Sequence, residues 1–185
     1  MIIGITGSFG AGKGIVVDYL VKQRGFKHYS ASGFITEEIV RQGMPVSRDS
    51  MIVVANDLRA THGPAYIIES LYKRAQKTGG NAVIEALRAV AEVRKIKELG
   101  GFVIGVDAEP KLRYERAFKR GSEKDDVSFE HWLDQEKRES NPDDPTKQNV
   151  FGSLKESDVL ITNNGTQEEL FAQVEEVLRK ISKKI

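Results

Sequence analysis

The chain has 185 residues, of which 39% are hydrophobic and 30% are charged, and this predicts one compact domain with a substantial core. A formal net charge of +1 gives no overall field for nucleic acid, so we expect no nucleic-acid partner. The chain has no cysteine, which excludes disulfides, thiolate nucleophiles and zinc–cysteine sites. Charged residues soon interrupt every apolar run, so we expect no membrane span and a cytoplasmic protein.

Short apolar runs alternate with helical patterns along the chain. The runs predict strands at 1–6, 26–30, 81–85, 102–107 and 158–162. Helical periodicity and caps predict helices at 12–24, 32–42, 47–61, 64–78, 90–99, 110–120 and 128–139, and a last helix after Thr166. Pro64 is expected at the first position of its helix. Thr166 and Glu169 have the spacing of a capping box at the start of the last helix.

Strands that are almost entirely apolar, separated by helices, indicate a parallel sheet covered on both faces. We therefore predict a doubly wound α/β fold with a five-stranded parallel sheet, in a single domain over residues 1–185. Ligands of such sheets bind beyond the carboxyl ends of the strands, so the residues that follow each strand are the candidates for a site.

The segment GSFGAGKG follows the first predicted strand and opens directly into a helix. It fits the pattern GxxxxGK, with Gly7, Gly12 and Lys13 in register. Glycines allow backbone N–H groups to approach phosphate oxygens, the helix N-terminus favours an anion, and the lysine adds a point charge. We predict a P-loop that binds ATP or GTP, with contacts from Gly7, Ser8, Phe9, Gly10, Ala11, Gly12, Lys13, Gly14 and Ile15.

One position departs from the general motif. The residue after the lysine is ordinarily Ser or Thr, whose hydroxyl binds Mg²⁺, but here Gly14 and Ile15 follow Lys13. Mg²⁺ must then be held by the nucleotide, by water and by carboxylates. Weak metal affinity or slow turnover is the hypothesis that follows.

A basic segment follows the fourth strand. Arg113, Arg116 and Arg120 are spaced three and four apart, which places them on one helix face. A solvated helix face would have the same spacing. Because the segment follows a strand end and leads into an acidic loop, we predict a lid over residues 111–147 in which Arg116 and Arg120 close on the triphosphate.

Together these motifs resemble the nucleoside monophosphate kinase group of P-loop kinases. The resemblance rests on GxxGxGKG, on His28-Tyr29-Ser30 at the second strand, on VIEALR at the third, on RxxRxxxRG after the fourth and on DVLITNNGTQEEL at the fifth. The relatives it suggests are the adenylate-kinase-related and deoxynucleotide monophosphate kinases and dephospho-CoA kinase. It implies a helical acceptor-binding insertion, here at 31–78.

The resemblance also implies roles for single residues. The turn at Asn164 and Gly165 would lie against the adenine, and Ser30 would face the acceptor. Glu85 would reach Mg²⁺ through water, although a structural ion pair is an equally good interpretation. Arg88, three residues later, would contact the acceptor phosphate and act in catalysis with Lys13, Arg116 and Arg120.

The acceptor is the open point. Dephospho-CoA kinases have an aspartate after the second strand that takes the hydroxyl proton, whereas this chain has Ser30-Ala31-Ser32-Gly33. A monophosphate acceptor needs no such base, so a nucleoside or deoxynucleoside monophosphate is the leading hypothesis. Its phosphate would be held by Arg88 and by an arginine of the insertion, chosen from Arg41, Arg48, Arg59 and Arg74, with Arg59 preferred. Dephospho-CoA kinase is the alternative, and a nucleotide-binding protein with little or no turnover is the second alternative.

Overall fold

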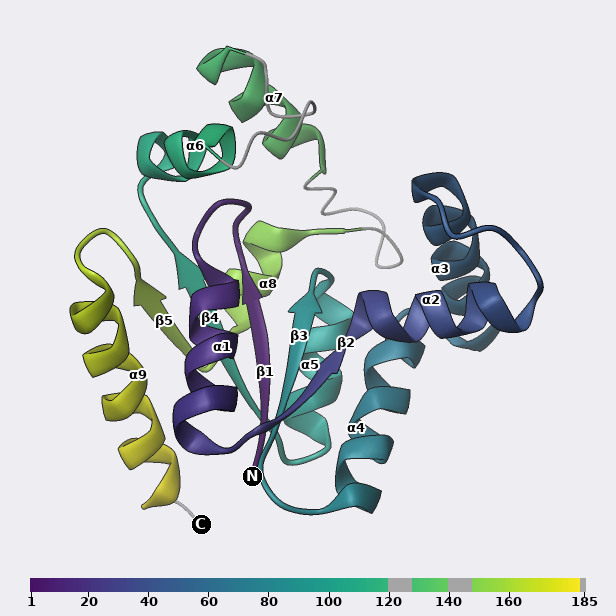
Figure 1. Ribbon diagram of the computed structural model, residues 1–185, viewed down its shortest axis with the longest axis horizontal. Coiled ribbons are helices and arrows are strands. Elements are labelled where there is room, and N and C mark those ends of the chain that lie inside the picture. Colours follow the sequence, from purple (N-terminus) through teal and green to yellow (C-terminus); the bar gives the residue numbers. More distant parts are fainter. Residues whose placement is uncertain (120–127, 140–147, 184–185) are drawn as a thin grey trace.

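A computed structural model describes residues 1–119, 128–139 and 148–183 of the chain. Its centre is a five-stranded sheet in which neighbouring strands are parallel and follow the order β2-β3-β1-β4-β5 (Figure 1). The strands are β1 (Ile2–Gly7), β2 (Lys27–Ser30), β3 (Ala82–Leu87), β4 (Phe102–Asp107) and β5 (Val159–Thr162). The predicted doubly wound α/β fold is confirmed.

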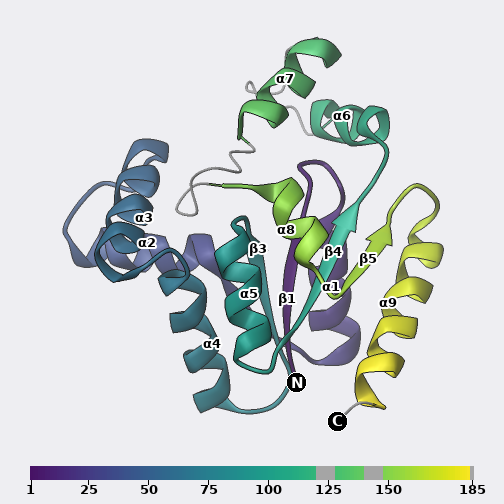
Figure 2. The ribbon, with the colours of Figure 1, turned by 180° about the vertical axis from the view of Figure 1, so that it is seen from behind.

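Helices cover both faces of this sheet. They are α1 (Lys13–Arg24), α2 (Ala31–Arg41), α3 (Arg48–His62), α4 (Tyr66–Thr78), α5 (Val90–Glu98), α6 (Pro110–Lys119), α7 (Phe129–Glu139), α8 (Val150–Glu156) and α9 (Gln167–Ser182). Helices α1 and α9 cover one face, and α4, α5 and α8 cover the other, as the two opposite views show (Figures 1 and 2). Helices α6 and α7 lie beyond the carboxyl ends of the strands, while α2 and α3 lie beside β2. No helix in the described segments has the length and apolar character needed to cross a membrane.

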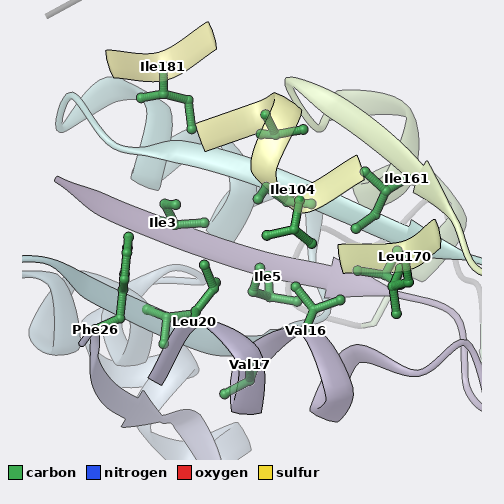
Figure 3. Close-up of a cluster of buried hydrophobic side chains, with 14 of the residues drawn as sticks. Ile3, Ile5, Val16, Val17, Leu20, Phe26, Ile104, Ile161, Leu170 and Ile181 are labelled. Atoms are coloured by element: carbon green, nitrogen blue, oxygen red, sulfur yellow. The ribbon is translucent and has the colours of Figure 1, made fainter. Parts of the chain in front are cut away.

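Strand β1 is buried on both faces because it is the middle strand. Ile3 and Ile5 are fully buried and pack with Val16 and Leu20 of α1 and with Leu170 of α9 (Figure 3). A strand covered on both faces reads as a continuous apolar run, which is why it was recognisable in the sequence. The loop after Gly7 therefore starts from a rigid support.

The other face carries a second core, which extends into the helices beside β2. Ile84 of β3 packs in one cluster with Ile39 of α2, Val54 of α3 and Ile68 of α4. These helices fall within the predicted insertion at 31–78, whose boundaries stay a prediction. Their packing against β3 fixes α2 and α3 beside the carboxyl edge of the sheet.

Two local predictions were wrong. Pro64 does not begin its helix, because α4 starts at Tyr66 with Ala65 at its N-cap. Helix α8 was not predicted at all, since it is short and contains Gly152, which lowers helix propensity. The capping box of the last helix is confirmed, with the Thr166 hydroxyl accepting from the Glu169 amide.

Strand β3 contains a bulge next to the phosphate loop. Ile5 of β1 pairs with Glu85 and Thr6 pairs with Leu87, so Ala86 has no opposite residue. Its φ angle is 70°, the only positive value at a non-glycine residue in the described part of the chain. A bulge changes the direction of the residues that follow it, and here these lead to Arg88.

This geometry makes a prediction about stability. The Ala86→Gly substitution should raise the free energy of unfolding by ~0.5 kcal/mol, because glycine relieves the strain at positive φ but loses more chain entropy. Urea denaturation measures the difference. Ala82→Gly, on the same strand in regular pairing, is the control and should be destabilising. A lower stability for Ala86→Gly would contradict the account.

Candidate nucleotide-binding site

The loop between β1 and α1 packs too closely against its neighbours to carry side chains at two of its glycines. Gly10 has φ 78°, and a Cβ there would lie 2.3 Å from the carbonyl oxygen of Arg113. Gly12 has φ 92°, and a Cβ there would lie 2.3 Å from Nδ2 of Asn163. These contacts explain the glycines in physical terms and leave the loop backbone as the surface that a ligand would meet.

Lys13 is the first residue of α1 and points back over the loop. Its Nζ donates to the carbonyl oxygens of Gly7 and Ser8, at 2.8 Å each. The ammonium group therefore lies at the positive end of the helix, among the loop atoms that a polyphosphate would approach. The contact predicted between Lys13 and the nucleotide phosphates stays a prediction.

The turn after β5 holds the loop from one side. Asn163, only 4% exposed, donates through Nδ2 to the carbonyl oxygen of Ala11 at 2.9 Å. Arg116 of α6 donates through Nη1 to the carbonyl oxygen of Asn163 at 2.8 Å. Arg116 thus lies beside the turn that the resemblance assigns to the adenine, and its predicted contact with the donor phosphates stays a prediction.

Arg113 holds the tip of the loop from the other side. This side chain is only 3% exposed, and its guanidinium donates to the carbonyl oxygens of Ala108, at 2.9 Å, and Phe9, at 3.3 Å. Both of its Nη atoms also donate to the carboxylate of Glu136 on α7. The guanidinium lies 5.2 Å from the ring centroid of Trp132. Arg113 is therefore a buried connection between the phosphate loop and α7, whereas the sequence placed it with Arg116 and Arg120 on one lid face.

The described residues offer few ligands for a metal ion. No group of three or more His, Asp or Glu side chains among them could hold one. Gly14 has open space around it and Ile15 is 40% exposed, so no hydroxyl replaces the missing Ser or Thr. Glu85, at the end of β3, forms an ion pair with His28 at 3.2 Å. This donor set fits a Mg²⁺ ion that is held mainly by the nucleotide and water, with Glu85 as the nearby carboxylate.

The turn predicted to face the adenine is fixed by side-chain hydrogen bonds. Asn164 accepts through Oδ1 from the amide of Glu109, at 2.8 Å, which joins the ends of β4 and β5. Gly165 has no room for a Cβ, because the Glu169 carboxylate folds back onto it to form the capping box. Both residues are therefore held in place beside the loop, and their contact with a base stays a prediction.

Two arginines that were predicted to hold the acceptor are connected at the turn after β3. Arg59 of α3 donates through Nη2 to Oε1 of Glu92 at 3.4 Å, while its buried Nε has no partner in the described structure. Glu92 is only 2% exposed, and its Oε2 accepts from the amides of Arg88 and Ala89, at 2.7 and 3.1 Å. Arg88 itself is exposed and donates through Nη1 to Gln148 at 3.3 Å. Glu92 thus connects the insertion to the turn that carries Arg88.

The other candidate arginines are used differently or lie outside the description. Arg41 pairs with Glu38, and Arg74 pairs with Glu37 at 2.7 Å, both on the surface of the insertion. The side chain of Arg48 and the whole of Arg120 lie outside the described residues, as do the lid segments 120–127 and 140–147. Arg59 is therefore the insertion arginine that reaches the carboxyl edge of the sheet.

A pocket lies where β2 meets α2. It has a volume of about 610 Å³ and is lined by Ser30, Ser32, Gly33, Thr36, Glu37 and Val40. Ser30 caps α2, with its Oγ accepting from the amide of Gly33 at 3.4 Å. Ser30 also pairs with Glu85 across the strands, so the pocket opens beside the end of β3. The predicted substrate residue therefore lies at a cavity at the carboxyl end of β2, and β3 separates β2 from the strand that leads into the phosphate loop.

Sequence reasoning did not find the contacts that hold the site from behind. Asn163 follows a strand directly and so carried a positional signal, but its bond to the loop depends on the β4–β5 register. The pairing of Arg113 with Glu136 joins residues 23 apart along the chain. Glu92 was unremarkable in sequence, because a charged residue in a helix is usually exposed.

Comparison with known proteins identifies the family of this chain. The profile described as an AAA domain matches residues 3–149. A UPF0200 protein of Pyrococcus abyssi is 30% identical over 98% of this chain and 97% of its own length. The chain belongs to the UPF0200 family. A second UPF0200 protein, from Pyrococcus horikoshii, is 29% identical over the same shares.

Solved structures support the fold of this UPF0200 chain. A protein of Thermus thermophilus superposes with a TM-score of 0.65 at 19% identity, covering 97% of each chain. The shikimate kinase of Acinetobacter baumannii, in complex with shikimate, gives a TM-score of 0.58 at 16% identity, covering 99% of this chain and 93% of its own. At these identities the likeness establishes a P-loop kinase-like fold. It does not extend to the nucleoside monophosphate kinase group in particular.

The buried connection to α7 makes a second prediction. Glu136→Gln should lower the free energy of unfolding by about 2–3 kcal/mol, because the buried Arg113 loses its hydrogen-bonded counter-charge and keeps only Asp107, 3.5 Å from its Nε. Urea denaturation followed by the fluorescence of Trp132, the only tryptophan, measures this loss. Glu130→Gln, at an exposed position of the same helix, is the matched control. Equal stability of the two variants would show that Arg113 does not depend on Glu136.

Proposed function

We propose that this protein transfers the γ-phosphoryl group of ATP to a nucleoside or deoxynucleoside monophosphate. The observation that carries the proposal is the arrangement at the carboxyl edge of the sheet. The phosphate loop with Lys13 over it follows β1, and the pocket lies at the end of β2. The turn after β3, the strand between them, carries Arg88 and is connected to Arg59 through Glu92. Phosphoryl transfer depends mainly on such positioning and positive charge.

The residues of the chain would act as follows. The loop amides and Lys13 hold the donor β- and γ-phosphates, and Arg59 and Arg88 hold the acceptor phosphate. A phosphate oxygen of the acceptor attacks the γ-phosphorus, and the bond from that phosphorus to the β–γ bridging oxygen breaks, so that ADP leaves. Mg²⁺, bound through the nucleotide and water near Glu85, supplies charge neutralisation between the phosphates.

The lack of a carboxylate in the stretch after β2 favours a monophosphate acceptor. Ser30 and Ser32 share a hydrogen bond of 2.8 Å, and neither hydroxyl can act as a base at neutral pH. An alcohol acceptor needs a group that takes its proton as the new bond forms. The phosphate oxygen of a nucleotide is already anionic and needs none.

One observation favours the second candidate, dephospho-CoA kinase. Glu85 pairs with Ser30 across the β2–β3 ladder, so a carboxylate does lie at the strand end next to the pocket. If Glu85 took a proton instead of serving Mg²⁺, a hydroxyl acceptor would become possible. The position of this carboxylate is the reason to keep both acceptors in the test.

A panel of acceptors tests the proposal. Purified protein is mixed with ATP, Mg²⁺ and either one nucleoside monophosphate, one deoxynucleoside monophosphate or dephospho-CoA, and product is measured in a single turnover. We expect a nucleoside diphosphate product, and a loss of about 10²–10³ in rate for Arg88→Ala. Phosphorylation of dephospho-CoA alone would select the second candidate. Intact ATP binding without any product would leave a nucleotide-binding protein with little turnover.

The residue after Gly14 gives a further prediction. Ile15→Thr should lower the Mg²⁺ concentration needed for half-maximal turnover, because a hydroxyl at this position can bind the metal. A Mg²⁺ titration of turnover at fixed ATP measures this, with Ile15→Val as the control that changes size without adding a hydroxyl. An unchanged titration curve would show that the chain does not lack a metal ligand here.

A further inference from the structure

The pocket beside α2 carries one charge, and that charge is negative. Among its lining residues only Glu37 is ionisable, and Arg74, which is not in the lining, binds it at 2.7 Å. Its volume of about 610 Å³ is in the ordinary range for a small-molecule site, roughly 300–1,000 Å³. The lining itself therefore offers no positive charge to hold a phosphate, and the neutral part of an acceptor fits the pocket better.

The hydroxyl groups of the pocket are used by the protein itself. Ser30 and Ser32 share a hydrogen bond, and Thr36 donates to the carbonyl oxygen of Ser32 at 2.9 Å. The Glu37 carboxylate uses only one of its two oxygens in this way. Its Oε2 accepts from Nη1 of Arg74 at 2.7 Å, while Oε1 accepts no hydrogen bond from the described residues. Glu37 thus offers the strongest acceptor in the pocket.

One ion pair orients the carboxylate of Glu37. The Arg74 guanidinium that binds it lies 4.7 Å from the ring centroid of Phe34, and the Glu37 side chain is 63% exposed, so the pair lies on the surface of the insertion. Val40, one turn further along α2, is 63% exposed and presents an apolar surface at the same pocket. A flat ring resting on Val40 would present its edge to Glu37.

We propose that Glu37 selects acceptors whose base carries an exocyclic amino group, an inference that rests on the proposed function. An ionised carboxylate only accepts hydrogen bonds, so it favours the amino groups of adenine, cytosine and guanine. A base with a carbonyl oxygen in place of the amino group would bring two hydrogen-bond acceptors together with no donor between them, so its binding is disfavoured. The acceptor phosphate then points away from Glu37, towards Arg59 and Arg88.

Matched pairs of monophosphates test this selection. AMP is compared with IMP, GMP with XMP, and CMP with UMP, by kcat/KM with ATP and by equilibrium binding. We expect the best acceptor to carry an amino group and to exceed its deaminated partner by about tenfold. In Glu37→Gln the ratio should fall below about threefold, because the amide can also donate to a carbonyl oxygen.

Glu38→Gln is the matched control on the same helix. Hydrogen bonds from Arg41 and Gln42 lower the pKa of the Glu38 carboxyl to about 2, and this side chain does not line the pocket. Its amino-to-oxo ratio should equal that of the wild type. Equal use of both members of every pair, or a ratio unchanged in Glu37→Gln, would overturn the role of Glu37 and leave the proposed function intact. No binding and no phosphorylation of any monophosphate would overturn both.

Discussion

The site depends on one constraint: the backbone between β1 and α1 must be held open towards the carboxyl edge of the sheet. Three side chains do this, two of them from distant parts of the chain. Lys13 bonds the loop carbonyls, Asn163 bonds the carbonyl of Ala11, and Arg113 bonds the carbonyl of Phe9. Each uses a carbonyl oxygen and so occupies no amide of the loop, although the Ala11 amide donates within the loop to the carbonyl oxygen of Ser8 at 3.2 Å. The two closely packed glycines, Gly10 and Gly12, make this arrangement sterically possible.

The same contacts connect the loop to the rest of the carboxyl edge. Arg113 joins it to α7 through Glu136, and Arg116 joins α6 to the turn after β5. On the other side, the bulge at Ala86 and the buried Glu92 fix the turn that carries Arg88. The residues proposed to bind the donor and the acceptor therefore rest on opposite neighbours of β1, namely β4 and β3. This division is the physical basis for treating the edge as a two-substrate site.

Much of the fold was predictable because the sheet is parallel and buried. Continuous apolar strands and well-capped helices give strong local signals, as Thr166 with Glu169 illustrates. The phosphate loop was predictable for the same reason, since its chemistry is contained in eight consecutive residues. Helix α8 was missed because neither its length nor Gly152 gives a helical signal.

Arg113 was misassigned because spacing along a helix says which residues share a face, and not whether that face is buried. Its burial follows from Glu136 and Trp132, which only the tertiary structure brings near.

The central claim is that this loop binds a polyphosphate through its amides and the Lys13 ammonium group. Calorimetric titration with a non-hydrolysable ATP analogue, in the presence of Mg²⁺, tests it most directly on the wild type and on Lys13→Ala. We predict saturable binding to the wild type at a 1:1 ratio and a loss of affinity of at least about tenfold in the variant, because a charge-assisted contact is removed. Absence of binding to the folded wild type, or equal affinity in both proteins, would contradict the account.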